Sequence, residues 1–249
     1  MKTLLTFAFL AVASTAFAQQ CSNATLTGAF AYTTDTTATI DGKTATNSQV
    51  GRIVFDGKGK FTVRVASTTA AEVTVGDTAG DYLLGSDCTM TGKTAEGLEF
   101  DGVVVNGGSD FYIMTREPGI TSAGGGTKIE AQGACSAATL NGGFGYFTQG
   151  TLTVESALVS LGELGVLNFD GRGTVTGTYS TSAGGLVERK SYDGKYEVAA
   201  DCTGNAKFTI NGAAYIMNFT VASSGNAFGL SFGGGGSVLT GQATRLFPK

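Results

Sequence analysis

The chain of 249 residues has no histidine, no tryptophan and only two prolines, and charged residues make up 14% of it. Without histidine it can form neither a Ser-His-Asp nor a Cys-His catalytic system, and it offers no histidine ligand for a metal. Its lysines and arginines form no cluster and its net charge is −4, which argues against a nucleic-acid partner. Carboxylates and tyrosines remain as candidates for chemistry, and we expect no metal site and no cofactor.

Long apolar runs are also missing, except at the N-terminus. Residues 1–18 carry Lys2, an apolar stretch and a small-x-small end at Ala16–Ala18. This pattern predicts a signal peptide cut before Gln19, and hence a secreted or periplasmic protein. The alternative, an N-terminal membrane anchor, is disfavoured because the stretch is shorter than the ~20 residues of a spanning helix. No later segment is long and apolar enough to cross a membrane as a helix.

The sequence does contain a long internal repeat. Cys21-Ser-Asn-Ala-Thr-Leu-Thr-Gly-Ala-Phe-Ala-Tyr32 returns as Cys135-Ser-Ala-Ala-Thr-Leu-Asn-Gly-Gly-Phe-Gly-Tyr146. Two further pairs keep the same offset (135 − 21 = 169 − 55 = 202 − 88 = 114), namely Phe55-Asp-Gly-Lys-Gly59 with Phe169-Asp-Gly-Arg-Gly173, and Asp87-Cys-Thr89 with Asp201-Cys-Thr203. A repeat of this length indicates a duplicated domain. We therefore predict a signal peptide at 1–18, a first domain at 19–133 and a second at 134–249.

The four cysteines predict two disulfides, because the chain is expected to be exported. The repeat favours Cys21–Cys88 and Cys135–Cys202, since these two pairs have the same spacing (88 − 21 = 202 − 135 = 67). Zinc ligation is the alternative, and the spacing and the lack of histidine argue against it.

Alternating apolar residues and 39 glycines indicate an all-β fold. Asp56-Gly57 and Asp170-Gly171 stand between alternating runs and predict tight hairpins. The number and spacing of the expected strands predict two tandem antiparallel β-barrels, each with one disulfide, with β-sandwiches as the alternative. Phe111–Met114 resembles Ala214–Met217 at an offset of 103, which predicts eleven extra residues (114 − 103) in the first unit near Glu96–Ser109.

The repeated acids and tyrosines are the candidate functional residues. Asp56 and Asp170 could be calcium ligands, but they lack the ligand series of a calcium loop and fit turn chemistry better. A turn is also favoured over a catalytic pair for Asp87 and Asp201, so no catalytic residue is predicted. Four tyrosines could line a cavity and orient a ligand, although core positions with the hydroxyl at the barrel rim are favoured for them: Tyr32, Tyr82, Tyr146 and Tyr196.

Taken together, the three repeated motifs resemble those of uncharacterised exported bacterial two-repeat β proteins. In general character the chain is similar to calycin-type barrels, the group of the lipocalins and the allene oxide cyclase and dirigent proteins. That resemblance implies a small antiparallel barrel with an apolar interior. The Gly-x-Trp signature of lipocalins is absent, since the chain has no tryptophan.

These observations favour an exported, non-catalytic protein that binds a small apolar ligand in its barrels. A structural or adhesive envelope protein is one alternative and an allene oxide cyclase-like isomerase is another. Ligand binding requires a cavity of roughly 300 Å³ or more, and rings that fill the barrels would exclude it. Adhesion predicts an exposed apolar patch, and catalysis predicts a carboxylate inside a barrel beside a tyrosine.

Overall fold

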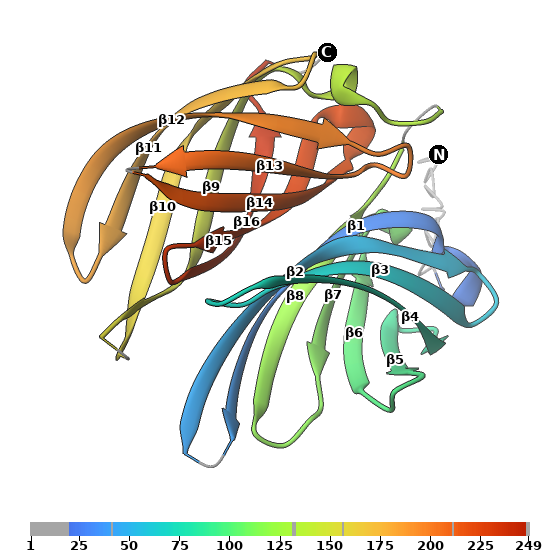
Figure 1. The fold of residues 1–249 in the computed structure, drawn as a ribbon. Coiled ribbons are helices and arrows are strands. Elements are labelled where there is room, and N and C mark those ends of the chain that lie inside the picture. The colour runs from blue at the N-terminus through green and yellow to red at the C-terminus, as the bar shows by residue number, and fades with distance from the viewer. Residues whose placement is uncertain (1–19, 41, 131–132, 156, 211, 248–249) are drawn as a thin grey trace, which may run out of the picture.

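The computed structural model describes residues 20–40, 42–130, 133–155, 157–210 and 212–247. The predicted signal peptide lies outside these residues. The described chain forms two closed antiparallel barrels of eight strands each (Figure 1). Each strand pairs with the next one along the chain, and the last strand pairs with the first, which is the order of an up-and-down barrel. The prediction of two tandem barrels is confirmed, and the sandwich alternative is not.

The first barrel contains two 3₁₀ turns, η1 and η2, and strands β1 to β8: η1 (Asn23–Thr25), β1 (Thr27–Ile40), β2 (Lys43–Asp56), β3 (Lys60–Thr68), β4 (Val73–Leu84), β5 (Thr89–Thr94), β6 (Glu99–Val105), η2 (Asn106–Gly108), β7 (Asp110–Thr115) and β8 (Ile120–Lys128). The second barrel repeats this order with η3 (Ala137–Leu140), β9 (Asn141–Val154), β10 (Ala157–Asp170), β11 (Thr174–Ala183), β12 (Leu186–Val198), β13 (Thr203–Ile210), β14 (Ala213–Ala222), η4 (Ser223–Gly225), β15 (Ala227–Gly234) and β16 (Ser237–Arg245). Among these residues, no helix has the length and apolar character needed to cross a membrane.

The repeated Cys-Ser-x-Ala-Thr-Leu motif closes one end of each barrel. In η1 the Thr25 hydroxyl accepts the backbone N–H of Ser22 at 3.1 Å, and η3 repeats this contact. The capped turn directs a leucine into the barrel, and both Leu26 and Leu140 are fully buried there. The first motif of the repeat therefore codes for a plug.

Both predicted disulfides, Cys21–Cys88 and Cys135–Cys202, are confirmed. Each ties the segment before the plug to the turn that contains the Asp-Cys-Thr motif. Cys88 has a φ of 67°, a left-handed conformation that is unfavourable for a residue with a side chain. Asp87 supports this turn, because its carboxylate accepts the backbone N–H of Thr89 at 3.1 Å and the Thr89 hydroxyl at 2.7 Å.

Aromatic rings fill the space above each plug. In the first barrel the ring centroids of Phe30 and Phe55 are 5.6 Å apart, and both rings contact Phe111 edge to face. The corresponding rings of the second barrel are Phe144, Phe169 and Phe228. Edge-to-face contacts of this kind add to the stabilisation that burial of the rings provides.

The late strands correct one prediction about the repeat. The backbone N–H of Val104 donates to the carbonyl of Cys88, and that of Val221 donates to the carbonyl of Cys202, both at 2.9 Å. The offset has therefore grown from 114 to 117 (221 − 104), and Phe111 corresponds to Phe228. The predicted match to Ala214–Met217 and the eleven extra residues are wrong, because similar letters fall on non-equivalent strands. The second unit is longer here by three residues (117 − 114).

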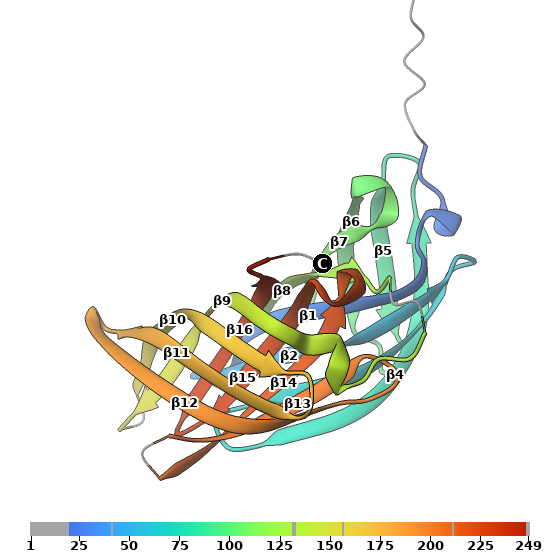
Figure 2. The same cartoon turned by 90° about the horizontal axis from the view of Figure 1, so that it is seen from above.

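The two barrels pack against each other through β1, β2 and β3 of the first and β14, β15 and β16 of the second (Figure 2). Small polar residues form hydrogen bonds across this interface. The fully buried Ser48 donates its hydroxyl to the carbonyl of Leu239 at 3.0 Å, and the hydroxyls of Thr68 and Ser231 are 3.0 Å apart. Gly233 permits the close approach, since a Cβ there would lie 2.4 Å from the Thr68 methyl carbon.

Candidate ligand site

The first barrel contains a cavity of about 370 Å³ in the half away from its plug. The floor is apolar and is formed by Phe55, Phe61, Phe100 and Phe111. The cavity extends towards the open end, where the hairpins β1–β2, β3–β4, β5–β6 and β7–β8 turn. Its volume lies in the range of known small-molecule sites.

The upper part of the cavity is lined by polar side chains, with hydroxyl groups from five of the eight strands. The polar residues of the lining are Thr34, Thr36, Gln49, Thr78, Thr94, Glu96, Thr115 and Ser122. Several already pair with one another: the Thr36 hydroxyl donates to Ser122 at 2.8 Å, and the Thr78 hydroxyl donates to Glu96 at 2.7 Å. The Thr115 hydroxyl is buried and has no partner among the described residues. The site thus combines an apolar floor with a hydrogen-bonding rim.

The second barrel is filled at the equivalent positions. Where the first barrel has Thr94 and Thr115, the second has Phe208 and Phe232, whose rings stack with centroids 5.7 Å apart. Three further replacements enlarge side chains at this level: Val65 by Tyr179, Thr78 by Tyr192, and Ser122 by Leu239. All five of the larger side chains are buried.

A glycine beneath one of these rings provides the space that the larger side chain needs. Tyr192 pairs across strands with Gly177, and a Cβ on that glycine would lie 2.6 Å from the tyrosine Cζ. In the first barrel the same pair is Thr78 and Val63, which both line the cavity. A large side chain over glycine has therefore replaced a small one over valine. One pocket per barrel was predicted, but the second barrel has rings in that space.

The second barrel also holds a half-buried carboxylate that the sequence analysis missed. Glu163 lies on β10 opposite Thr148 of β9, and burial raises its pKa to about 7, a rise that Lys190 partly opposes. Burial, together with the charge of Glu163, raises the pKa of Tyr179 to about 12 and that of Tyr192 further. The signal was present in the alignment of the repeats, because Glu163 stands where the first unit has Gln49 (163 − 49 = 114).

The four predicted tyrosines fall into two groups. Tyr32 lines the cavity, and burial raises its pKa. Tyr146, its counterpart, accepts a hydrogen bond from Tyr192 at 3.4 Å inside the filled barrel. Tyr82 and Tyr196 instead lie at the plugged ends, where their hydroxyls donate at 2.9 Å to the carbonyls of Asn23 and Ala137. The structure therefore brings one of the four, Tyr32, to the cavity and places Tyr82 and Tyr196 among structural contacts.

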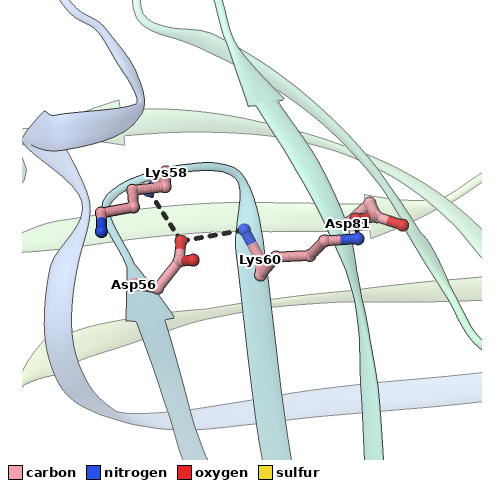
Figure 3. Close-up of polar contacts among 4 residues, drawn as sticks. All are labelled: Asp56, Lys58, Lys60 and Asp81. Atoms are coloured by element: carbon pink, nitrogen blue, oxygen red, sulfur yellow. Dashed lines mark hydrogen bonds and ion pairs between the residues drawn. The ribbon is translucent and has the colours of Figure 1, made fainter.

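The repeated aspartates lie in turns, away from the cavity. The Asp56 carboxylate accepts the backbone N–H groups of Lys58 at 2.7 Å and Lys60 at 2.9 Å, and these bonds hold its pKa below the usual value (Figure 3). The Lys60 side chain extends to Asp81 on β4. Asp170 makes the equivalent turn.

Asp87 is exposed, and hydrogen bonds from the Thr89 hydroxyl and amide lower its pKa. Asp201 is half-buried and accepts the same two bonds from Thr203. Within the described residues, no group of three or more histidine, cysteine or acidic side chains could hold a metal ion.

A second hollow follows the seam between the barrels and has a volume of about 400 Å³. It includes exposed charged residues such as Arg64 and Glu197, which lie on the outer faces of the two sheets. Strands from both barrels border this hollow, whereas the first-barrel cavity is surrounded by a single closed sheet. We therefore take the first-barrel cavity as the candidate site.

Comparison with protein families gives no match, and comparison with curated proteins gives none. Two solved structures can be aligned over most of the chain. One is the crystal structure of CghA, which is 9% identical, with 87% of each chain covered and a TM-score of 0.28. The other is a protein from Nitrosomonas europaea assigned provisionally as AttH, which is 9% identical, with 92% of this chain and 96% of that chain covered and a TM-score of 0.31. These similarities are too weak to bear on function.

Proposed function

We propose that this is an exported, non-catalytic protein that binds one small, largely apolar ligand in its first barrel. The observation that carries the proposal is the difference between the repeats. The first barrel keeps a cavity of about 370 Å³ over a phenylalanine floor, and the second carries five buried larger side chains at the matching positions. The two disulfides fit an oxidising compartment, which supports export.

The second barrel also shows that the cavity is not needed for the fold. Both barrels have the same strand order, plug and disulfide, yet one is filled and the other is hollow. Replacing threonine by a packed aromatic ring adds buried apolar area, which stabilises a barrel by roughly 25 cal/mol per Å². The first barrel forgoes this stabilisation, and a ligand-binding role explains why.

The test is to fill the first barrel with the side chains of the second. Purified protein is titrated with the neutral fluorescent probe N-phenyl-1-naphthylamine, and we expect saturable binding of one probe per chain. The double variant Thr94→Phe/Thr115→Phe introduces the Phe208–Phe232 pair and should lower the affinity at least tenfold. Thr91→Phe places the same ring on the outer face of β5 and serves as the matched control.

Far-UV circular dichroism and thermal unfolding establish that both variants are folded. Unchanged probe binding by the folded double variant would refute the proposal. Native mass spectrometry of protein from its own host would then show whether a natural ligand copurifies with the wild type.

An adhesive role is our second candidate, and exposed apolar side chains on two hairpins of the second barrel favour it. Leu186 and Val187 are 77% and 70% exposed, and Leu158 is 39% exposed. The two hairpins adjoin, because the backbone N–H of Gly184 donates to the carbonyl of Ser160. The double variant Leu186→Ser/Val187→Ser should abolish adhesion to immobilised proteins or glycans and leave probe binding unchanged.

An isomerase role has less support. The condition set for it, a carboxylate inside a barrel beside a tyrosine, is met by Glu163 and not by Asp87 or Asp201. Glu163 lies in the filled barrel, where rings occupy the space that a substrate would need.

A further inference from the structure

We infer that the ligand of the first barrel is an amphiphile with a neutral or cationic hydrogen-bonding head, and that chains ending in a carboxylate are selected against. This inference rests on the proposed function and narrows it to a chemical class. It follows from three properties of the cavity: its polarity gradient, its unused hydrogen-bonding groups and the sign of the charges around its rim.

The polarity gradient sets the orientation of the ligand. Leu26 and Phe30, both fully buried, close the lower end beneath the phenylalanine floor. The hydroxyl groups lie towards the open end. Because burial of a polar head without partners is unfavourable, the apolar part enters first and the head stays at the level of the rim.

The rim can donate and accept hydrogen bonds. The Thr115 hydroxyl is buried without a partner among the described residues, and Tyr32 also lines the cavity. A hydroxyl or amine head matches these two hydroxyl groups. The head can donate a hydrogen bond, and the hydroxyls of Thr115 and Tyr32 can both donate and accept one.

The charges around the rim argue against an anionic head. Glu96 is the charged residue among the described residues that line the cavity, and the Thr78 hydroxyl holds its pKa low, so it is ionised at neutral pH. A ligand carboxylate at this level would stand near Glu96 with no lysine or arginine in the lining.

Two of the neighbouring cations are already paired. Lys93 lies 3.3 Å from Glu99, and Arg116 binds Asp101. Of the residues that the structure describes, the other charged ones at the open end are Lys43 near the tip of the β1–β2 hairpin, Glu72 before β4 and Glu117 between β7 and β8. Acids outnumber bases among these described residues, so a bound carboxylate would have to take up a proton or remain unpaired beside a like charge.

The test uses three ligands with the same ten-carbon chain and different heads: decanol, decylamine and decanoate. Each competes with N-phenyl-1-naphthylamine at about pH 8. We expect decanol and decylamine to displace the probe, with decanoate at least tenfold weaker. Binding of decanoate should strengthen as the pH falls towards about 4, where carboxylic acids become largely neutral.

The variant Glu96→Gln tests the cause. It should weaken the binding of decylamine and strengthen the binding of decanoate by about threefold each. This modest size is expected for a solvent-exposed charge. Glu72→Gln removes an exposed acid that is also at the open end but outside the lining, and should change neither.

The failures of the two proposals are distinguishable. Decanoate that competes as well as decanol at pH 8, or an unaltered preference in Glu96→Gln, would overturn the inference about the head and leave ligand binding intact. Absence of binding by the probe and all three chains would overturn the proposed function itself.

Discussion

Removing the half-buried carboxylate of the second barrel should stabilise the protein, and more so as the pH rises. The change is Glu163→Gln, and its reason is the shift of the Glu163 pKa from 4.5 to about 7 on burial. The folded state therefore holds this proton more tightly than the unfolded chain does. The corresponding stabilisation is complete below about pH 4.5 and is lost as the pH rises to about 7.

The size of the effect follows from the same two values. A difference of 2.5 units (7 − 4.5) at 1.36 kcal/mol per unit gives about 3 kcal/mol as an upper limit for the destabilisation at pH 8. Glutamine carries no charge and avoids this cost. It also restores a contact, since in the first barrel the Thr34 hydroxyl donates to Gln49 at 3.2 Å, whereas the equivalent Thr148 hydroxyl is buried without a partner among the described residues.

Urea denaturation of wild type and Glu163→Gln at pH 5, 6, 7 and 8 measures the effect. The free energy of unfolding of the variant should rise relative to that of the wild type across this range, with most of the rise between pH 5 and 7. The reverse exchange, Gln49→Glu, is the matched control, because its carboxylate would face the hollow barrel and should show a much smaller pH dependence. An equal difference between variant and wild type at pH 5 and at pH 8 would refute the argument.

Two further predictions concern the plugged ends. Tyr82→Phe and Tyr196→Phe should each lower the free energy of unfolding by about 1 kcal/mol through the loss of a hydroxyl–carbonyl bond, and both should leave probe binding unchanged; weakened binding would return these tyrosines to the ligand site. Cys21→Ala/Cys88→Ala opens a loop with a separation of 67 residues and should cost about 4 kcal/mol in the chain-entropy account, and a variant as stable as the wild type in urea would contradict a structural role for the bridge.

The sequence predicted the barrels, the hairpins and the disulfides because each of these depends on a few residues at fixed positions in the chain. The plug needs a hydroxyl at a fixed spacing, the hairpin needs Asp-Gly, and the bridge needs two cysteines, and each requirement leaves a short motif. The repeat then turned these motifs into a disulfide pairing and a fold. A duplicated motif is a strong signal for what both copies share.

The site left no motif, because it consists of small residues where the other copy has large ones. Thr78 and Thr94 are unremarkable until they are set beside Tyr192 and Phe208. Glu163 likewise stands out only when it is compared with Gln49, its equivalent in the first repeat. Strand pairing is needed to show that both side chains point inward. The misplaced match of Phe111–Met114 with Ala214–Met217 shows the limit of letters alone, since register follows from hydrogen bonds across strands.

The packing of one barrel on the other has a mechanical consequence for the cavity. Strand β2 presents Gln49 to the interior and its neighbours Ser48 and Val50 to the second barrel, so one wall of the cavity is two sheets thick. On that side the filled barrel supports the wall, whereas the outward-facing side chains of β4, β5 and β6 are mostly exposed. When the cavity widens to admit a ligand, the displacement should therefore be one-sided. It should be largest in the strands that bear Thr78 and Thr94. The filled barrel would thus act as a rigid support for one wall of the cavity in the first barrel.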